Sequence, residues 1–284
     1  MNTNRSMAMR HLPILLAALA VLPATGAAQS RQTQRDAFTM SERVPDGAWI
    51  RVRNLNGELH VRPSNSDKVE INVTKAWRKG DPKDVTIEMK RGSDGSILVC
   101  AIWTLNASTT CTEREYSTHN DHDRDRGRYD NDRNGDRNDV SAAFEIRVPK
   151  GVKIGVWTVN GAVSVEGATS EVRAGTVNGG VEASSSGGPV QANTVNGSVR
   201  ASMGRFDSNQ DLSFTTVNGS VIAEFTGDID ADIDLSTVNG RFQTDWPVTI
   251  SGRIDPRRLR ARIGRGGPHI RLETINGNVE LRKR

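Results

Sequence analysis

The residues that could hold a metal ion gather in one polar stretch between 119 and 135. His119 and His122 stand three apart, a spacing at which two imidazoles could share a transition metal. Further on, alternating oxygen-bearing side chains match the start of a calcium loop, namely Asp130, Asp132 and Asn134. The position that would complete that loop is Ser instead of Glu, and a stretch so rich in Asp and Asn matches the pattern by chance. We therefore interpret the stretch as a solvated loop, keep those three residues as candidate metal ligands, and expect no cofactor.

Four carboxylates alternate with aliphatic residues shortly before the C-terminal part of the chain. Asp228, Asp230, Asp232 and Asp234 would all lie on one face of a strand, with the aliphatic set on the other face. The interpretation we favour is a solvated outer face that discourages edge-to-edge association. The alternative is a site for a cation or for a basic partner.

No set of residues in the sequence has the spacing of a catalytic centre. His60 and His269 are the histidines of the strand-like regions, and neither belongs to a nucleophile elbow or a metal-ligand spacing. The glutamates that a β-helix lyase or hydrolase could use are scattered relative to the repeat described below: Glu166, Glu171, Glu182 and Glu224. The sequence therefore predicts that the protein is not an enzyme.

The C-terminal stretch 250–284 is strongly basic. Ten basic residues oppose Asp255, Glu273 and Glu280. Such a patch could contact an anionic envelope polymer or lipid head groups. Interleaved aromatic residues are lacking, so nucleic acid is not an expected partner.

The N-terminus indicates export. Arg5 and Arg10 precede a short apolar run, and small residues then lead to Ala28. This order is typical of a cleaved signal peptide at 1–28, and the run is too short to span a bilayer. We expect a flexible segment at 29–44, a mature chain without a transmembrane segment, and a periplasmic or extracellular location.

The cysteines fit that compartment. Cys100 and Cys111 are the two cysteines of the chain, and an even count at close spacing in an exported protein predicts a disulfide. A metal-binding or catalytic pair is the alternative, but no His, Asp or Glu lies between them.

One tetrapeptide recurs along the chain. Thr-Val-Asn-Gly occurs at 158–161, 176–179, 194–197, 216–219 and 237–240, with variants at 274–277 and 54–57. Successive Asn positions from 160 are 18, 18, 22, 21 and 37 residues apart, and the long last interval suggests a degenerate repeat between 241 and 270. The predicted turn residues are Asn56, Gly57, Asn160, Gly161, Asn178, Gly179, Asn196, Gly197, Asn218, Gly219, Asn239, Gly240, Asn276 and Gly277.

The flanks of each copy predict strands. Apolar residues recur six and four positions before each Asn and three positions after it, which is the period-2 alternation of a half-buried strand. The fold class is therefore all-β. We expect a β-solenoid of 18–22-residue coils, in which Asn-Gly forms corners and equivalent Thr and Asn side chains stack as hydroxyl and amide ladders. The alternative is an antiparallel meander or sandwich of Asn-Gly hairpins.

The strand pattern also sets the domain organisation. Further strand-like runs at 49–53, 68–77, 85–91 and 96–103 share the corner at 56–57, so 45–284 is read as a single β-repeat domain. The segment 116–139 interrupts it with a run of Asp, Arg, Asn and Gly that cannot bury a core. We expect this insertion to be disordered.

The repeat resembles a widespread bacterial family of adhesin-like domains built from β-strand repeats, whose function is unknown. The matching features are Thr-Val-Asn-Gly with a Gly-x-Val-x-Ala continuation, as in 194–201, and a Val-Pro-Lys-Gly-Val lead-in at 148–152. The resemblance covers roughly 45–284 apart from the insertion. It implies a β-solenoid-like fold and a place in the cell envelope, and it carries over no catalytic residues.

The expectation is a non-enzymatic, exported cell-envelope protein, an adhesin-like structural or binding module. Its partner would be an anionic envelope polymer or another envelope protein. Two alternatives stay open. One is a carbohydrate-active β-helix enzyme, which would need carboxylates converging from adjacent coils. The other is an envelope-stress or signalling accessory protein.

Overall fold

A computed structural model describes residues 34–284 except 104–106, 114–115, 121–138, 205–209 and 251–254. The described residues form strands and one short 3-10 helix, Pro82–Asp84, which confirms the all-β prediction.

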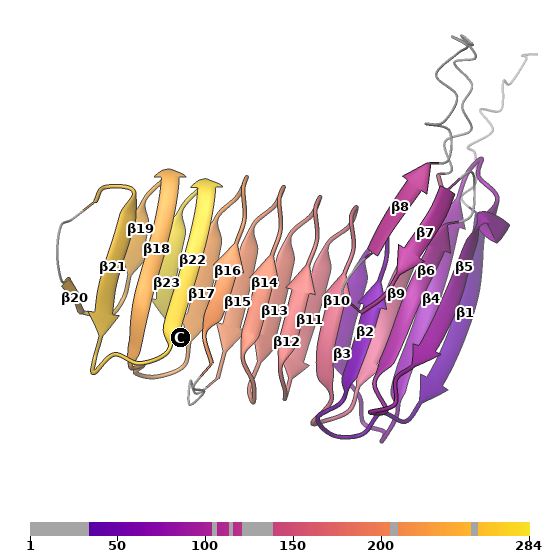
Figure 1. Cartoon of the computed structure of the whole chain (residues 1–284), viewed down its shortest axis with the longest axis horizontal. Helices are drawn as coiled ribbons and strands as arrows, with labels where there is room; N and C mark the ends of the chain where they lie inside the picture. The colour runs from indigo at the N-terminus through magenta and orange to yellow at the C-terminus, as the bar shows by residue number, and fades with distance from the viewer. Residues whose placement is uncertain (1–33, 104–106, 114–115, 121–138, 205–209, 251–254) are drawn as a thin grey trace, which may run out of the picture. The chain divides into compact units, whose positions relative to one another are not determined.

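Two large sheets contain almost all the strands (Figure 1). Sheet A has ten strands, in the spatial order β1 (Gln34–Glu42), β4 (Val69–Trp77), β9 (Ser141–Val148), β3 (Leu59–Pro63), β11 (Val163–Ala168), β13 (Val181–Ser185), β15 (Val199–Met203), β17 (Val221–Phe225), β23 (Val279–Lys283) and β19 (Phe242–Thr244). Sheet B has eleven, in the order β20 (Val248–Ile250), β21 (Arg258–Ile263), β18 (Ala231–Asn239), β22 (His269–Asn276), β16 (Leu212–Thr215), β14 (Val190–Asn193), β12 (Val172–Gly175), β10 (Lys153–Trp157), β2 (Trp49–Arg53), β6 (Ile97–Trp103) and β5 (Val85–Arg91). A separate hairpin consists of β7 (Ala107–Cys111) and β8 (Tyr116–Asn120).

The strands of successive copies pair in parallel and in register. Each copy supplies one strand to sheet B before its Asn-Gly and one to sheet A after it. In sheet B, Val172 of β12 aligns with Ile154 of β10 and with Val190 of β14. Consecutive strands of a hairpin would pair antiparallel within one sheet. The observed order is therefore that of stacked coils and not that of the hairpin alternative.

The period-2 pattern fills the space between the sheets. In sheet B the residues six positions before each Asn are buried, and in sheet A those three positions after it are buried in every copy except Phe242, which is half-buried. Because each side chain stacks on its equivalent in the next coil, the core is a set of aliphatic columns instead of one cluster.

The Asn-Gly corners are shaped by stacking more than by the turn itself. Gly179 has φ +154°, and a Cβ there would lie 2.2 Å from the carbonyl oxygen of Gly161 in the preceding coil. Glycine is thus required because backbones of adjacent corners touch. The Asn side chains form an amide ladder, as in the 2.8 Å bond that Nδ2 of Asn196 donates to Oδ1 of Asn178.

The threonine hydroxyls differ from the expected hydroxyl ladder. Each buried Thr donates to the glycine carbonyl of the neighbouring corner, as Thr194 does to Gly179 at 2.8 Å. A buried hydroxyl gains more from an otherwise unpaired carbonyl than from another hydroxyl, because the corner carbonyls lie outside the sheet ladders. Thr therefore bridges coils through the backbone.

The prediction of a degenerate repeat between 241 and 270 is wrong. Residues in that interval form β19, β20 and β21, and the last two pair antiparallel. The final copy then returns to the stack, so β22 lies between β16 and β18 and Asn276 bridges both Asn218 and Asn239. The long interval is an excursion of the chain and not a missing coil.

Two predicted irregular segments contain strands. Residues 34–42 of the expected flexible segment 29–44 form β1, which pairs antiparallel with β4, and Met40 packs against the core. Residues 116–120 of the predicted insertion form β8, and residues 121–138 lie outside the described part of the chain. Where the chain is described again, Asp139 accepts backbone hydrogen bonds from residues 78–80.

Candidate functional site

The outward-facing side of sheet B carries an aromatic and basic cluster at strands β2, β10 and β12. Three cations lie against one indole: the guanidinium carbons of Arg51 and Arg173 are 4.8 and 4.9 Å from the ring centroid of Trp49, and Nζ of Lys153 is 5.6 Å away. Each contact is a cation–π attraction to the negative face of the ring. We call Trp49, Arg51, Lys153 and Arg173 the Trp49 surface.

Glycines on the neighbouring strands make room for two indoles. A Cβ on Gly155, the register partner of both Arg51 and Arg173, would lie 3.6 Å from the Trp49 ring. A Cβ on Gly175 would lie 2.9 Å from the Trp157 ring. Both rings therefore lean across the next strand, and Trp49 reaches the cations from β10 and β12 as well as the one from its own strand.

Positive charge exceeds negative charge around Trp49. Glu171 contacts Lys153 at 3.6 Å and Arg173 at 2.8 Å, and Glu113 contacts Arg51 at 3.5 Å. Arg53 adds a fourth cation, and its guanidinium donates at 2.8 Å to the neutral backbone oxygen of Glu113. Burial, together with the charge of Arg51, lowers the pKa of Arg53 below its usual range. The four cations thus have two carboxylates within contact distance, and the charge of Arg51 also acts on a third, that of Asp94.

The β7–β8 hairpin forms a wall beside the cluster. The Cys100–Cys111 disulfide fastens it to the outer side of β6, which confirms the predicted bond, although the bond joins two elements instead of stapling one turn. Tyr116 of β8 packs on Trp157 with ring centroids 5.8 Å apart, and its hydroxyl donates to the carbonyl of Ala101 at 2.7 Å. Burial raises the pKa of Tyr116, so this phenol stays protonated and keeps its hydrogen bond.

A polar row continues from the cluster across the sheet. In-register pairing places the residues five positions before each Asn side by side, in the order Arg51, Gly155, Arg173, Gln191, Ser213 and Arg271. At the usual strand spacing of about 4.8 Å, the row extends roughly 24 Å. Gln191 and Ser213 supply an amide and a hydroxyl between the arginines. Arg271 is paired with Glu273 at 2.7 Å and is followed in register by Asp234 of β18, so the unbalanced positive charge lies at the Arg51 end.

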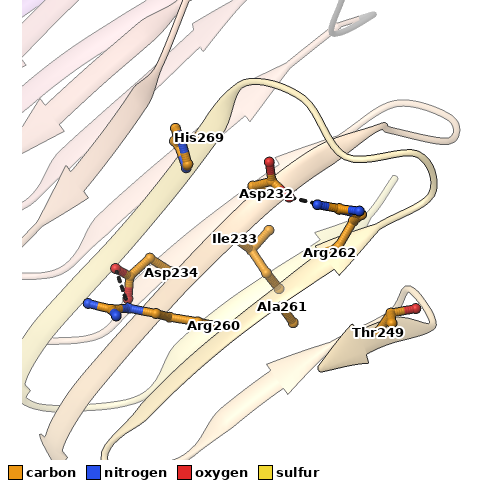
Figure 2. A pocket seen from close by; sticks show the side chains of 8 residues that line it. All are labelled: Asp232, Ile233, Asp234, Thr249, Arg260, Ala261, Arg262 and His269. Atoms are coloured by element: carbon orange, nitrogen blue, oxygen red, sulfur yellow. Dashed lines mark hydrogen bonds and ion pairs between the residues drawn. The ribbon is translucent and has the colours of Figure 1, made fainter. Parts of the chain in front are cut away.

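The acidic row and the basic C-terminal stretch come together at the other end of sheet B (Figure 2). Arg262 contacts Asp232 at 3.2 Å, and Asp234 accepts from Arg258 and lies 3.6 Å from Arg260. Asp230 and Asp228 are paired in turn with Arg265 and Lys283, both at 2.7 Å. We call these four aspartates and their basic partners the Asp–Arg ladder.

The Asp–Arg ladder surrounds a pocket that is poorly equipped for chemistry. Its lining includes Asp232, Asp234, Arg260, Arg262 and His269, above the buried side chains of Ile233 and Ala261 (Figure 2). The hydrogen bond that Arg258 donates holds the pKa of Asp234 below its usual value. This carboxyl is therefore ionised and a poor proton donor. The guanidiniums already occupy the oxygens that a metal cation would need. The aspartates of the Asp–Arg ladder therefore form neither a bare solvated face nor a cation site. Most of the basic residues of the C-terminal stretch are paired within the molecule.

The other predicted chemical residues are not brought together. Asp130, Asp132, Asn134 and His122 lie outside the described residues, and His119 is in β8. Within the described ranges, no group of three or more His, Cys, Asp or Glu side chains could hold a metal ion. Glu171 and Glu224 are paired with Arg173 and Arg200, and no described helix is long and apolar enough to cross a membrane.

The Trp49 surface was missed by the sequence reasoning. Its signal was present in the aligned copies, because Trp49, Lys153 and Glu171 each stand seven residues before an Asn, and Arg51 and Arg173 each stand five before. The outward-facing positions of the repeat indicate which charged residues become neighbours. The apolar positions, which predict the fold, do not.

Comparison with known proteins gives structural likeness at low identity. No family model and no curated protein matches the chain. A "putative cell adhesion protein" from Clostridium sporogenes is 10% identical, with 89% of this chain and 100% of that chain covered and a TM-score of 0.47. A "putative adhesin" from Bacteroides fragilis is 11% identical, with 88% and 97% covered and a TM-score of 0.35. At such identities and TM-scores the likeness does not bear on function.

Proposed function

We propose that this chain is a non-enzymatic, exported binding module of the cell envelope, adhesin-like in that it presents a flat sheet face to a partner. The observation that carries the proposal is the Trp49 surface, where three cations meet at one indole and contact two carboxylates on the outer side of a regular sheet. A charge excess held on a rigid face is suited to binding a partner of opposite charge.

Two features support export. Residues 1–28 have the order of a signal peptide, and Cys100 and Cys111 form a disulfide. Disulfides persist in oxidising compartments outside the cytosol. The periplasm or the extracellular space is therefore the proposed location.

The state of the carboxylates supports a binding role over catalysis. A glycoside hydrolase needs one carboxyl group that can donate a proton and a second that acts as base or nucleophile. The adjacent pair Asp232 and Asp234 is instead neutralised by Arg262 and Arg258. Amides and hydroxyls on β14 and β16 of the same sheet, such as Gln191 and Ser213, can bind a polymer without cleaving it.

A fractionation and binding experiment tests the proposal. We expect the full chain, expressed in a Gram-negative host, to lose its leader by mass spectrometry and to leave the cytoplasm, whereas a chain lacking residues 2–28 stays there. The exported protein should cosediment with isolated cell envelopes and release no fragments from a polysaccharide panel. Retention in the cytoplasm with an intact leader, or turnover of any polymer, contradicts the proposal.

A further inference from the structure

The ligand of the Trp49 surface can be inferred from its charges and from the polar row beside it. We propose that the Trp49 surface and the row from Arg51 to Arg271 bind an acidic polysaccharide, whose carboxylate or phosphate groups contact Arg51, Lys153 and Arg173. This inference rests on the proposed function and adds the site and the chemical class of the ligand.

The three cations of the Trp49 surface contact two carboxylates of the protein, so one positive charge is left for an external anion. Arg51, Lys153 and Arg173 meet at one ring, so their charges repel one another at short range. The indole of Trp49 and the carboxylate of Glu171 hold them there despite this repulsion. An acidic group of a ligand placed above the ring would further reduce the repulsion among the three cations. Guanidinium groups bind carboxylate and phosphate in bidentate geometry.

The accessibility of the cations increases toward the row. The side chain of Arg51 is 18% exposed, that of Lys153 is 34% exposed and that of Arg173 is 58% exposed. Arg51 is thus fixed in the wall formed with Glu113, while Arg173 is open on the side where the row begins. A ligand can therefore reach the cluster from β12 and extend along the sheet away from the hairpin.

The row favours a hydroxyl-rich polymer over other anions. Gln191 and Ser213 follow Arg173 in register, and Asn193 and Thr215 lie beside them two residues further along the same strands. These groups can donate to and accept from sugar hydroxyls along the polymer. The large apolar side chains that are exposed among the described residues lie elsewhere, at the corners and on β1, β5 and β20. The face therefore lacks the apolar groups that a membrane-inserting surface needs.

The site differs from the one that composition suggested. The C-terminal basic stretch has more positive charge in the sequence, but Arg258, Arg262 and Arg265 are paired with aspartates of β18 and the segment just before it. An anionic polymer would have to displace those carboxylates. At the Trp49 surface Arg173 also has a carboxylate partner, but Glu171 is shared with Lys153 and the Arg173 side chain is 58% exposed, so an additional acidic group can reach it.

Binding to immobilised polymers tests the assignment. The purified protein is measured by biolayer interferometry on alginate, which carries carboxylates, and on poly(glycerol phosphate), with neutral dextran and duplex DNA as comparison polymers and phosphatidylglycerol vesicles assayed by sedimentation. We expect salt-sensitive binding to one or both acidic polymers, and the stronger of the two identifies the acidic group. Binding to dextran, DNA or vesicles as strong as to the acidic polymers overturns the proposal.

Matched variants locate the site. The double variant Arg51→Gln/Arg173→Gln should weaken binding by roughly tenfold or more, because Arg is enriched among the few central residues that dominate the affinity of an interface. The control Arg200→Gln/Arg282→Gln removes the same charge from the outer side of sheet A and should change binding less than about twofold, as exposed rim charges do. Equal losses in both variants mean that net charge and not this site controls binding, which contradicts the inference.

The fold of each variant is checked by its thermal melting curve. Trp49→Leu gives an independent test that removes no charge: it should release the cations and weaken binding, and unchanged binding counts against the site. If the protein cosediments with cell envelopes but binds no acidic polymer, the ligand assignment fails while the proposed function stands. If it binds neither, both fail.

Discussion

The two charged ends of sheet B use the same residue types in opposite ways. In the Asp–Arg ladder each aspartate has a basic partner on an adjacent strand or loop, so the charges are balanced within the fold. At the Trp49 surface the cations come from three parallel strands and outnumber the acids. Antiparallel pairing of β18 with β21 sets unlike charges opposite each other, whereas parallel stacking of β2, β10 and β12 collects whatever the repeat places at one position. Paired charges thus stabilise the β18–β21 end of sheet B, whereas unpaired positive charge at the Trp49 end is available to bind a ligand.

Loss of the disulfide, which lies at the Trp49 end, should have the largest effect on stability. Cys100→Ser/Cys111→Ser is expected to lower the free energy of unfolding by about 2–3 kcal/mol, given the short loop that the bond closes. It should also alter the fluorescence of Trp157, because Tyr116 is no longer held against it. Denaturant melts followed by circular dichroism and by fluorescence measure both effects. Reduced wild-type protein serves as the control, and an unchanged melt in either sample contradicts a structural role of the hairpin.

Breaking one rung of the ladder should have a smaller effect. Asp234→Ala leaves Arg258 and Arg260 without their carboxylate and should cost about 1 kcal/mol, the upper range for a partly exposed pair with bidentate geometry. The matched change at the other end, Glu171→Ala, should cost less in thermal stability and should strengthen binding to an acidic polymer. A stability loss at Glu171 that exceeds the loss at Asp234 would reverse the comparison.

Strong acidification should weaken the Asp–Arg ladder. Hydrogen bonds from Arg258 and from the backbone of Arg265 hold the pKa of Asp234 and that of Asp230 below the usual value for aspartate. Their stabilising contribution is therefore complete above about pH 4 and is lost as the pH falls through the lowered folded-state pKa. The melting temperature of wild type should approach that of Asp230→Asn/Asp234→Asn as the pH falls toward the most acidic conditions. A constant difference between the two proteins would show that these carboxylates are not protonated with the fold intact.

The smallest effect on stability is expected for a substitution of Gly155, which lies beneath the Trp49 ring. Gly155→Thr places a β-branched side chain on a strand, where it is tolerated, so the free energy of unfolding should change by less than about 0.5 kcal/mol. A Cβ there would lie 3.2 Å from Cγ of Arg51 and 3.6 Å from the Trp49 ring, so the added side chain should shift Arg51 against the indole and alter both fluorescence and polymer binding. Gly179→Thr is the contrasting control, since a Cβ there meets a backbone oxygen and the coil must open. Comparable melting temperatures for the two variants would contradict this distinction.

Much of the fold could be predicted from the repeat, because aliphatic periodicity on both sides of Asn-Gly specifies two strands and a corner. The order of the coils could not, since β22 and β18 present equivalent edges and only long-range pairing decides which one contacts β16. The disulfide was predictable from compartment and count. The Trp49 surface was not found because Trp49 and Arg173 are distant in sequence and become neighbours only through the register of three strands.

The return of the last copy into the stack sets the order in which the chain can fold. Strand β18 precedes its parallel partner β22 in the chain, and β19, β20 and β21 lie between them in sequence. Completion therefore requires the C-terminal coil to close a gap between segments already synthesised, a contact of long sequence separation that forms slowly. The coils from β2 to β17 can stack on one another without β22, so the two parts of the stack should differ in how early they become protected from hydrogen exchange during refolding.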